Sequence, residues 1–174
     1  MQDYLAAQAC VENIAGLSDV VYVGIKSELS TPLTLTENVY STPAFASGKG
    51  LYKFNCKSEG QQIQGSSQGK RGGFQLTFDF ALEAVDPETS KIARALNNLD
   101  VFFIVVDGDN SQIMYDPNRN VTFESDGLKS DSGKAVGDER VTTGTATLKG
   151  VKYPNLFVTA PASGGWDSLL HDAE

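Results

Sequence analysis

Histidine is nearly absent from this sequence. His171 is the single histidine among 174 residues, and it lies close to the C-terminal end. A catalytic triad or a proton relay built on histidine needs an imidazole that a rigid element holds in place. We therefore expect no catalytic residue of this kind, and the chain is predicted not to be an enzyme.

Cysteine is scarce as well. The chain has two cysteines, Cys10 and Cys56, which are too few for a disulfide scaffold. With one histidine beside them, they cannot complete a four-ligand zinc site. We expect two buried, reduced thiols, with a disulfide between them as the alternative, and neither a metal nor a cofactor.

Basic residues are outnumbered. The chain carries 14 Lys and Arg against 22 Asp and Glu, a net charge of −8. A protein that binds nucleic acid tightly shows clustered basic residues that neutralise phosphates. The balance argues against such a protein, but it is compatible with one that nucleic acid slides past without sticking.

Long apolar runs are missing, so we expect no membrane span, which needs about 18 consecutive apolar residues. The first residues, MQDYLAAQAC, contain an early acidic residue and no basic leader, so we expect no signal peptide. Synthesis in the cytoplasm follows as the expectation.

Two motifs resemble ligand sites and lack the residues that complete them. Asp107–Asn110 resembles the start of a calcium loop, but the twelfth position, where an acidic residue is needed, is Asn118. Gly65–Gly73 (GSSQGKRGG) resembles a phosphate-binding loop, but it lacks the Gly-Lys-Ser/Thr ending and leads into no helix. Both are predicted to be turns.

The stretch from Gly73 to Val106 supplies the core. Four apolar residues alternate with polar ones in its first part, the period of a half-buried strand: Phe74, Leu76, Phe78 and Phe80. Asp86 and Pro87 then predict the start of a helix over about 87–98, with Asn97 and Asn98 as a C-terminal cap. Residues 101–106 (VFFIVV) have no alternation, which predicts a strand buried on both faces.

The rest of the chain favours strands and turns, so we predict a single, mainly β domain over 1–174, sandwich-like or barrel-like, with one flanking helix. Further strands are expected at 20–25, 33–36, 51–56, 112–115, 121–124, 140–149 and 153–158. Residues 1–14 are expected to form a short helix or arm. Long loops are expected at 38–50 and 125–139, and a mobile tail from about Pro161, except where Trp166 and Leu169–Leu170 find a surface.

Residues 60–70 (GQQIQGSSQGK) are polar and hold one apolar residue, Ile63. They form either a solvated hairpin or a strand whose faces meet water and another subunit. This choice stays open at the level of the sequence.

The order of these parts resembles the major tail tube proteins of long-tailed bacteriophages, over about residues 10–160. The resemblance is carried by the strand, capped helix and buried strand of 73–106, by the hairpin DGDNSQIMY, and by GDERVTTGTATLKGVKYPNLFV. It implies a β-sandwich with a flanking helix, assembled as stacked hexameric rings around a lumen that DNA crosses. It also implies a virion location, contacts with other tail proteins, and no catalytic residues.

Four residues are predicted to contact other subunits in such an assembly. They are Tyr40 and Phe45 on the loop 38–50, and Lys70 and Arg71 in the glycine-rich turn. The two cations are expected to face carboxylates of a neighbour.

Two other classes of protein remain open. A carbohydrate-binding or receptor-binding β-sandwich would need more exposed aromatic residues than Trp166 and the loop pair. A small hydrolase would use acidic residues such as Asp79 and Glu83 near the central strand.

Overall fold

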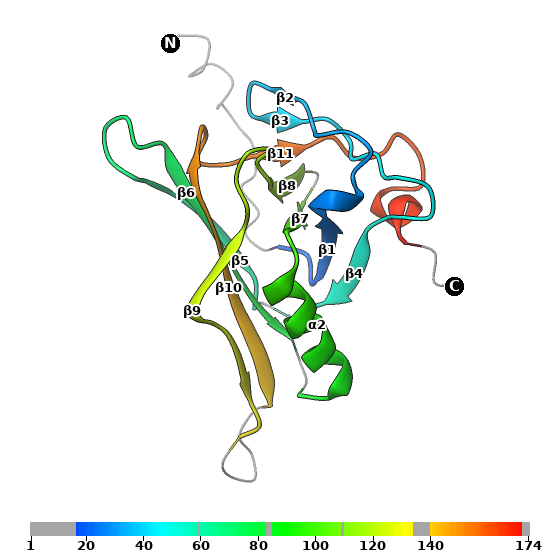
Figure 1. Cartoon of the computed structure of the whole chain (residues 1–174), viewed down its shortest axis with the longest axis vertical. Helices are drawn as coiled ribbons and strands as arrows, with labels where there is room; N and C mark the ends of the chain where they lie inside the picture. Colours follow the sequence, from blue (N-terminus) through cyan, green and yellow to red (C-terminus); the bar gives the residue numbers. More distant parts are fainter. Residues whose placement is uncertain (1–16, 59, 83–84, 109, 134–139, 172–174) are drawn as a thin grey trace.

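The computed structural model describes residues 17–58, 60–82, 85–108, 110–133 and 140–171 (Figure 1). Its strands are β1 (Val20–Ile25), β2 (Leu35–Thr36), β3 (Val39–Tyr40), β4 (Tyr52–Asn55), β5 (Gln62–Ser67), β6 (Phe74–Leu82), β7 (Val101–Asp107), β8 (Asn110–Met114), β9 (Thr122–Asp131), β10 (Val141–Val151) and β11 (Phe157–Val158). The described helices are α2 (Pro87–Asn98) and two 3-10 turns, Lys26–Glu28 and Trp166–Leu169. None of them is long and apolar enough to cross a membrane. The predicted class, mainly β with one α-helix, is confirmed for the described residues.

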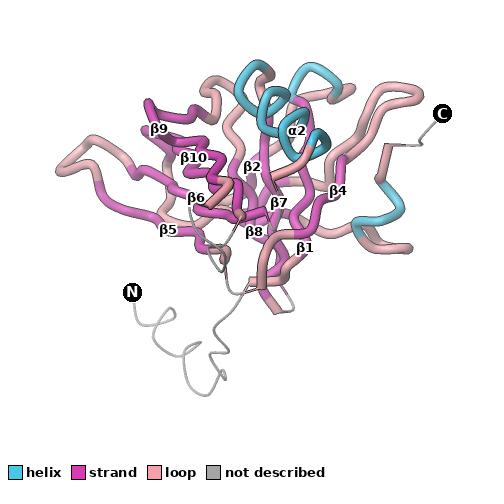
Figure 2. Tube along the Cα trace, turned by 90° about the horizontal axis from the view of Figure 1, so that it is seen from below, coloured by secondary structure: helices cyan, strands magenta, loops and turns pink. Residues whose placement is uncertain are grey.

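The strands form two sheets; in Figure 2, β5, β6, β9 and β10 lie on one side, and β1, β4 and β7 lie on the other. The first sheet has the order β2-β3-β11-β8-β7-β1-β4, and the second has the order β5-β6-β10-β9. Every pair in the second sheet is antiparallel. The second sheet is therefore a simple ladder of four strands with β5 and β9 at its two edges.

Aromatic rings from the two sheets meet in a shared core. Phe78 of β6 lies 5.3 Å from Phe103 of β7 between ring centroids, and Phe80 lies 5.8 Å from Phe103. On the opposite face of β7, Phe102 packs against Phe45 and Tyr115. Val101 to Val105 are 0–3% exposed, which confirms a strand buried on both faces.

Helix α2 begins where the sequence predicts. The Thr89 N–H donates to Asp86 Oδ1 at 2.7 Å, and the Asp86 N–H donates to Thr89 Oγ1 at 3.0 Å, a reciprocal cap. The predicted C-terminal cap at Asn97 and Asn98 is wrong. Both belong to the helix, and Leu99 ends it with an extended backbone at φ −111°, so no left-handed residue is needed.

Two predicted loops and strands differ from the structure. Residues 125–131 continue β9 instead of forming a loop, because they pair with β10 from Gly144↔Leu128 to Val141↔Asp131; residues 134–139 lie outside the described residues. The predicted strand at 153–158 is reduced to Phe157–Val158, and the loop 38–50 contains the short strand β3.

The tail after Pro161 was expected to be mobile except where Trp166 and Leu169–Leu170 find a surface, and these residues do pack on the first sheet. Trp166 is 6% exposed, and its indole N–H donates to Ser111 Oγ at 2.9 Å. Leu170 forms a β-bridge with Leu51. The tail packs there because the first sheet offers an apolar site for the side chain of Trp166. The predicted N-terminal arm lies outside the described residues.

Candidate functional site

The second sheet presents a polar face on the side away from the core. Cross-strand pairing aligns its residues in rows, such as Gln64↔Thr77↔Thr147 and Ser66↔Gln75↔Lys149. The period of two places these residues opposite to the buried ones of β6 and β10. We define the polar face as Gln62, Gln64, Ser66, Gln75, Thr77, Asp79, Thr122, Thr143, Thr145 and Lys149; Thr147 lies in one of these rows but is 4% exposed.

The few charges on the polar face have partners of their own. The Thr145 hydroxyl donates to Asp79 Oδ1 at 2.6 Å. Lys149 Nζ lies 2.7 Å from Glu124 Oε1, and this hydrogen bond holds the pKa of Glu124 below its usual range. The face is therefore mostly hydroxyls and amides, which hydrate readily but do not neutralise phosphates. Glu83, the second acidic residue of the hydrolase alternative, lies outside the described residues.

One border of this face, the edge strand β5, is unprotected. Alternate residues of an antiparallel strand direct their backbone N–H and C=O groups toward the partner strand. Gln68 N–H donates to Gly73 O at 2.9 Å, so by alternation Ser66, Gln64 and Gln62 bond β6. The backbone groups of Ile63, Gly65 and Ser67 then point outward, and among the described residues no strand pairs with them.

Edge strands of soluble proteins usually carry charges, proline or a bulge that prevents pairing with another chain. The β5 sequence, QIQGSS, has none of these devices, and its pairing with β6 runs without a register shift. Its core-facing side is closed by the backbone of Pro154, which approaches Gly65 so closely that a Cβ would lie 1.8 Å from the Pro154 oxygen. In the structure, residues 62–67 form an exposed edge strand that is joined to β6 in a hairpin, and whether another subunit covers this edge stays open.

The other border, β9, is shaped by a large bulge. Phe123 pairs with Ala146 and Leu128 with Gly144, so residues 124–127 stand opposite the single residue Thr145. Asp126 adopts a positive φ of 67° within this bulge and is exposed. Asp126 was not among the predicted contact residues, because residues 125–139 were expected to form a loop. The Asp-Gly step between two strand segments was the available signal.

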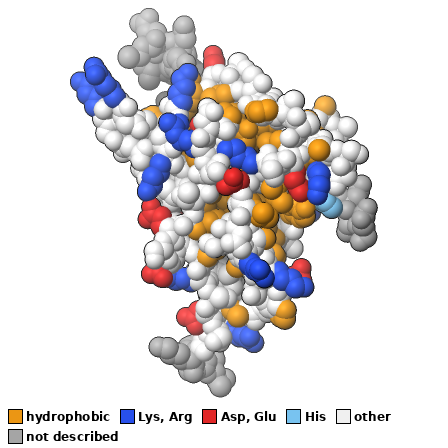
Figure 3. All heavy atoms as spheres, viewed as in Figure 1, with side chains coloured by type: hydrophobic (Ala, Val, Ile, Leu, Met, Phe, Trp, Pro, Cys, Tyr) orange, Lys and Arg blue, Asp and Glu red, His pale blue; other side chains and the backbone are white. Residues whose placement is uncertain are grey.

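The turn between β5 and β6 carries the two predicted cations. It projects beyond the body of the molecule at one end of the second sheet (Figure 1), and basic side chains mark its end (Figure 3). The Gly72 N–H donates to Gly69 O at 3.1 Å, which closes a β-turn with Lys70 and Arg71 at its centre. Both are exposed, and Arg71 has a φ of 72°, where glycine or asparagine is usual.

The two aromatic contact candidates are packed inside the protomer. Tyr40 is 2% exposed and meets Tyr115 edge to face at 5.2 Å. Phe45 is half-buried and stacks on Phe102. Burial of Tyr40 within the protomer speaks against its predicted contact with a neighbour, whereas Phe45 is partly exposed and its contact with another subunit stays a prediction.

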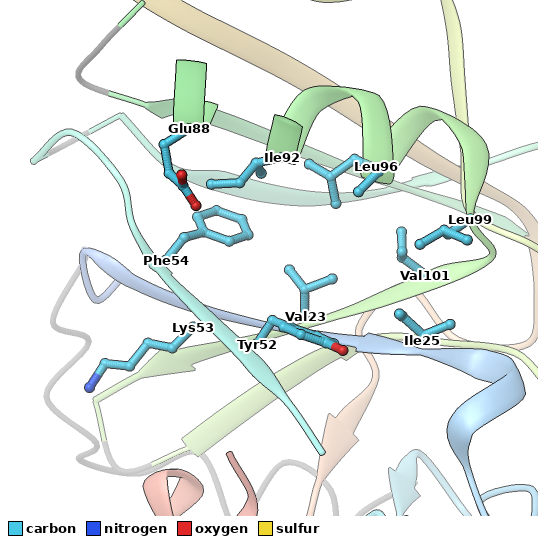
Figure 4. A pocket seen from close by; sticks show the side chains of 11 residues that line it. Val23, Ile25, Tyr52, Lys53, Phe54, Glu88, Ile92, Leu96, Leu99 and Val101 are labelled. Atoms are coloured by element: carbon cyan, nitrogen blue, oxygen red, sulfur yellow. The ribbon is translucent and has the colours of Figure 1, made fainter. Parts of the chain in front are cut away.

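A separate groove lies between α2 and the strands β1 and β4. Figure 4 shows Ile92 and Leu96 of the helix facing Val23 and Phe54 across it. Its volume is about 400 Å³, and its lining is mostly aliphatic and aromatic, with Glu88 and Lys53 as charged members. The groove exists because α2 holds one fully buried side chain, Leu96, and leaves its neighbours partly uncovered.

Cys56 is a buried free thiol. Burial raises its pKa to about 11, so it is protonated and unreactive at neutral pH. This agrees with the reduced, buried thiol that we expected, while Cys10 lies outside the described residues.

No family model, no curated protein and no solved structure matches this chain.

Proposed function

We propose that this chain is a structural virion protein, the major tail tube protein of a long-tailed bacteriophage. Copies assemble head to tail into hexameric rings, the rings stack into a tube, and the polar face of the second sheet lines the lumen that DNA crosses. Other tail proteins close the two ends. Six-fold symmetry, stacking and the virion location rest on the resemblance of the sequence.

The observation that carries this proposal is the unprotected β5 edge opposite β9 in a four-stranded antiparallel sheet. In the order β5-β6-β10-β9 each strand reverses direction, so β9 runs antiparallel to β5. The β9 strand of an identically oriented copy can therefore continue the ladder beyond β5. A contact between two different surfaces of one subunit generates a closed ring when the rotation between copies closes.

The polar face suits the wall of a DNA conduit. Its hydroxyl and amide groups offer water-mediated contacts, and its lysine is already paired with Glu124. A wall without free cations does not hold the phosphate backbone, because tight binding requires that Lys or Arg displace its counterions. The net charge of −8 acts in the same direction.

The carbohydrate-binding alternative is less well supported. Sugar recognition of the expected kind needs exposed aromatic rings, and the candidates that the sequence offered are used in packing. Trp166 and Tyr40 are 6% and 2% exposed, and Phe45 stacks on Phe102.

Assembly tests the proposal directly. The purified chain, concentrated in physiological salt, is examined by negative-stain microscopy and by sedimentation velocity. Rings with a central channel, and tubes built from them, are the expected result. A chain that stays monomeric at millimolar concentration would falsify the proposal.

A further inference from the structure

We propose that Arg71 of one copy and Asp126 of the next form a charge pair across the seam between β5 and β9, and that this pair sets the register of the ring. The inference rests on the proposed function, because it requires the seam. The inference goes beyond the proposed function because it names the two residues that align neighbouring copies.

Both residues have a left-handed backbone conformation, which is uncommon for arginine and better tolerated by aspartate. Arg71 has a φ of 72° and Asp126 a φ of 67°, and neither is glycine. Non-glycine residues in this region are uncommon, and they persist where the surrounding structure enforces them, often at functional positions. At Arg71, glycine neighbours on both sides of the turn show that the turn tolerates small residues, yet the chain carries Lys70 and Arg71 there.

Both residues also present charge that the protomer does not use. Each side chain is exposed, and neither has an ion-pair partner among the described residues. Glu124, the other acidic residue of the bulge, differs because it is bound to Lys149 at 2.7 Å. Arg71 and Asp126 thus carry charges of opposite sign at the two borders of the sheet, although β9 also holds the exposed Lys129.

The two residues cannot meet within one chain. They belong to opposite borders, separated by β6 and β10, which corresponds to about 14 Å at the usual strand spacing of roughly 4.8 Å. A contact between them therefore requires two copies.

Strand tilt brings them together between copies. Within one protomer, the bulge lies in the same cross-strand row as Thr145, Asp79 and Gln62. Gln62 is the first residue of β5. Strands of closed barrels tilt by about 35–45°, so a copy four strands away is displaced along the strands by roughly 13–19 Å, or about four to six residues.

The direction of this displacement follows from the handedness of the sheet. Viewed from the core with β6 running upward, β5 lies on the left, because residues that face away from the core direct their backbone groups to β5. In a right-handed barrel the copy on the left is displaced downward, toward the C-terminal end of β5. Asp126 of that copy then lies beside Ser67 and the turn that holds Arg71.

Cysteine cross-linking between two differently marked copies tests the pair. In a Cys10→Ser, Cys56→Ala background, one preparation carries Arg71→Cys and the other Asp126→Cys. A disulfide needs Cα atoms within about 7 Å. We expect a covalent dimer when the two are mixed and oxidised in assembly conditions, and none when Asp131→Cys replaces Asp126→Cys as the matched control on the same strand.

Charge reversal supplies the second arm. Arg71→Asp and Asp126→Arg should each raise the protein concentration needed for assembly by about tenfold, because like charges then face each other at every seam. The two reversals combined in one chain should restore assembly. Asp126→Asn, which tolerates a positive φ, removes the charge without altering the bulge and should weaken assembly less than the reversal.

The outcomes separate this inference from the proposed function. Rings that form without the mixed cross-link, or that ignore both reversals, overturn the Arg71–Asp126 pair and leave the tube intact. Cross-linking of Arg71→Cys copies to one another shows a two-fold β5–β5 contact, which overturns the pair and the head-to-tail ring together. A chain that stays monomeric overturns both.

Discussion

The indole N–H of Trp166 donates to the hydroxyl of Ser111 at 2.9 Å, across 55 residues of sequence. The same indole ring lies 6.3 Å from Tyr22, so the tail is anchored on the strands β1 and β8. The segment 161–171 therefore covers the face of the first sheet that points away from the second sheet, and we call this segment the strap.

The strap should contribute substantially to stability. Trp166→Ala should lower the free energy of unfolding by about 3–5 kcal/mol, the range for large aromatic residues removed from a core. Trp166→Phe keeps a ring but loses the hydrogen bond, and we expect a cost of about 1 kcal/mol. Urea denaturation followed by circular dichroism measures both, with the exposed Ser163→Ala as the control. Equal losses for Phe and Ala would show that the hydrogen bond, not the ring, dominates.

Acid should loosen the strap through Asp167. Hydrogen bonds from Lys53 and from the Tyr22 hydroxyl hold the pKa of this carboxyl below its usual value of 3.8. A group with a lowered pKa in the folded state stabilises the fold above its unfolded pKa, and this contribution is lost as the pH falls through the folded value. The thermal midpoint of the wild type should therefore fall below about pH 4 more steeply than that of Asp167→Asn. Parallel curves for the two proteins would contradict the assignment.

Helix α2 offers a graded test of packing. Leu96 is 5% exposed, so Leu96→Ala should cost about 2–5 kcal/mol. Ile92 is half-buried beside the groove, and Ile92→Ala should cost less. Asp86→Ala removes the cap and should lower stability by less than Leu96→Ala, while Asp86→Ser should retain most of it. Chemical denaturation measures the loss of unfolding free energy for each variant. A larger loss for Ile92→Ala than for Leu96→Ala would mean that the groove closes in solution.

Elements that depend on neighbouring residues could be predicted from the sequence, and elements that depend on remote residues could not. Asp86-Pro87 and the alternation of β6 depend on neighbouring residues, so the helix start and the strand were predicted correctly. Residues 125–131 are polar and look like a loop, and they form a strand because β10 supplies partners that are remote in the sequence.

The candidate site shows the same division. Lys70 and Arg71 were recognisable as exposed cations in a glycine-rich turn, which is a local property. The packing of Tyr40 on Tyr115 and of Phe45 on Phe102 joins residues remote in the sequence, so the burial of Tyr40 could not be predicted from the sequence. Asp126 could not be paired with Arg71 before the two borders of the second sheet were known.

The open edge predicts a variant that folds but does not assemble. The Ser67 N–H points away from β6 by the alternation of the ladder, so Ser67→Pro removes an outward donor and keeps the bonds that β5 makes with β6. Ser66→Pro is the matched control, since it breaks the hairpin itself. We expect Ser67→Pro to keep its circular dichroism spectrum and thermal midpoint near those of the wild type while rings disappear from micrographs. Normal tubes from Ser67→Pro would place the subunit contact elsewhere.

The polar face makes the last prediction, which concerns DNA. Wild-type protein should bind duplex DNA no more than weakly even at low salt, because its lysine on this face is already paired and phosphate binding needs clustered free cations. Gln62, Gln64 and Thr143 are exposed on the face, so replacing all three with Lys should create DNA binding. The logarithm of the association constant should fall linearly with the logarithm of the salt concentration, with a slope of roughly −0.9 per phosphate contacted. Assembled tubes of this variant should retain DNA inside the lumen.

A chain with three lysines on another surface, Thr31→Lys, Ala162→Lys and Ser163→Lys, has the same net charge and serves as the control for this experiment. Those positions are exposed and lie outside the polar face. Fluorescence anisotropy with labelled duplex measures binding to unassembled protein, and nuclease protection measures DNA held within tubes. Protection by the polar-face variant alone would mean that this face lines the lumen. Equal protection by both variants would mean that the wall of the tube is formed by a different surface. The double variant Lys70→Glu, Arg71→Glu tests the turn separately. If it loses DNA binding that the wild type shows, while it still assembles, the turn has a nucleic-acid role.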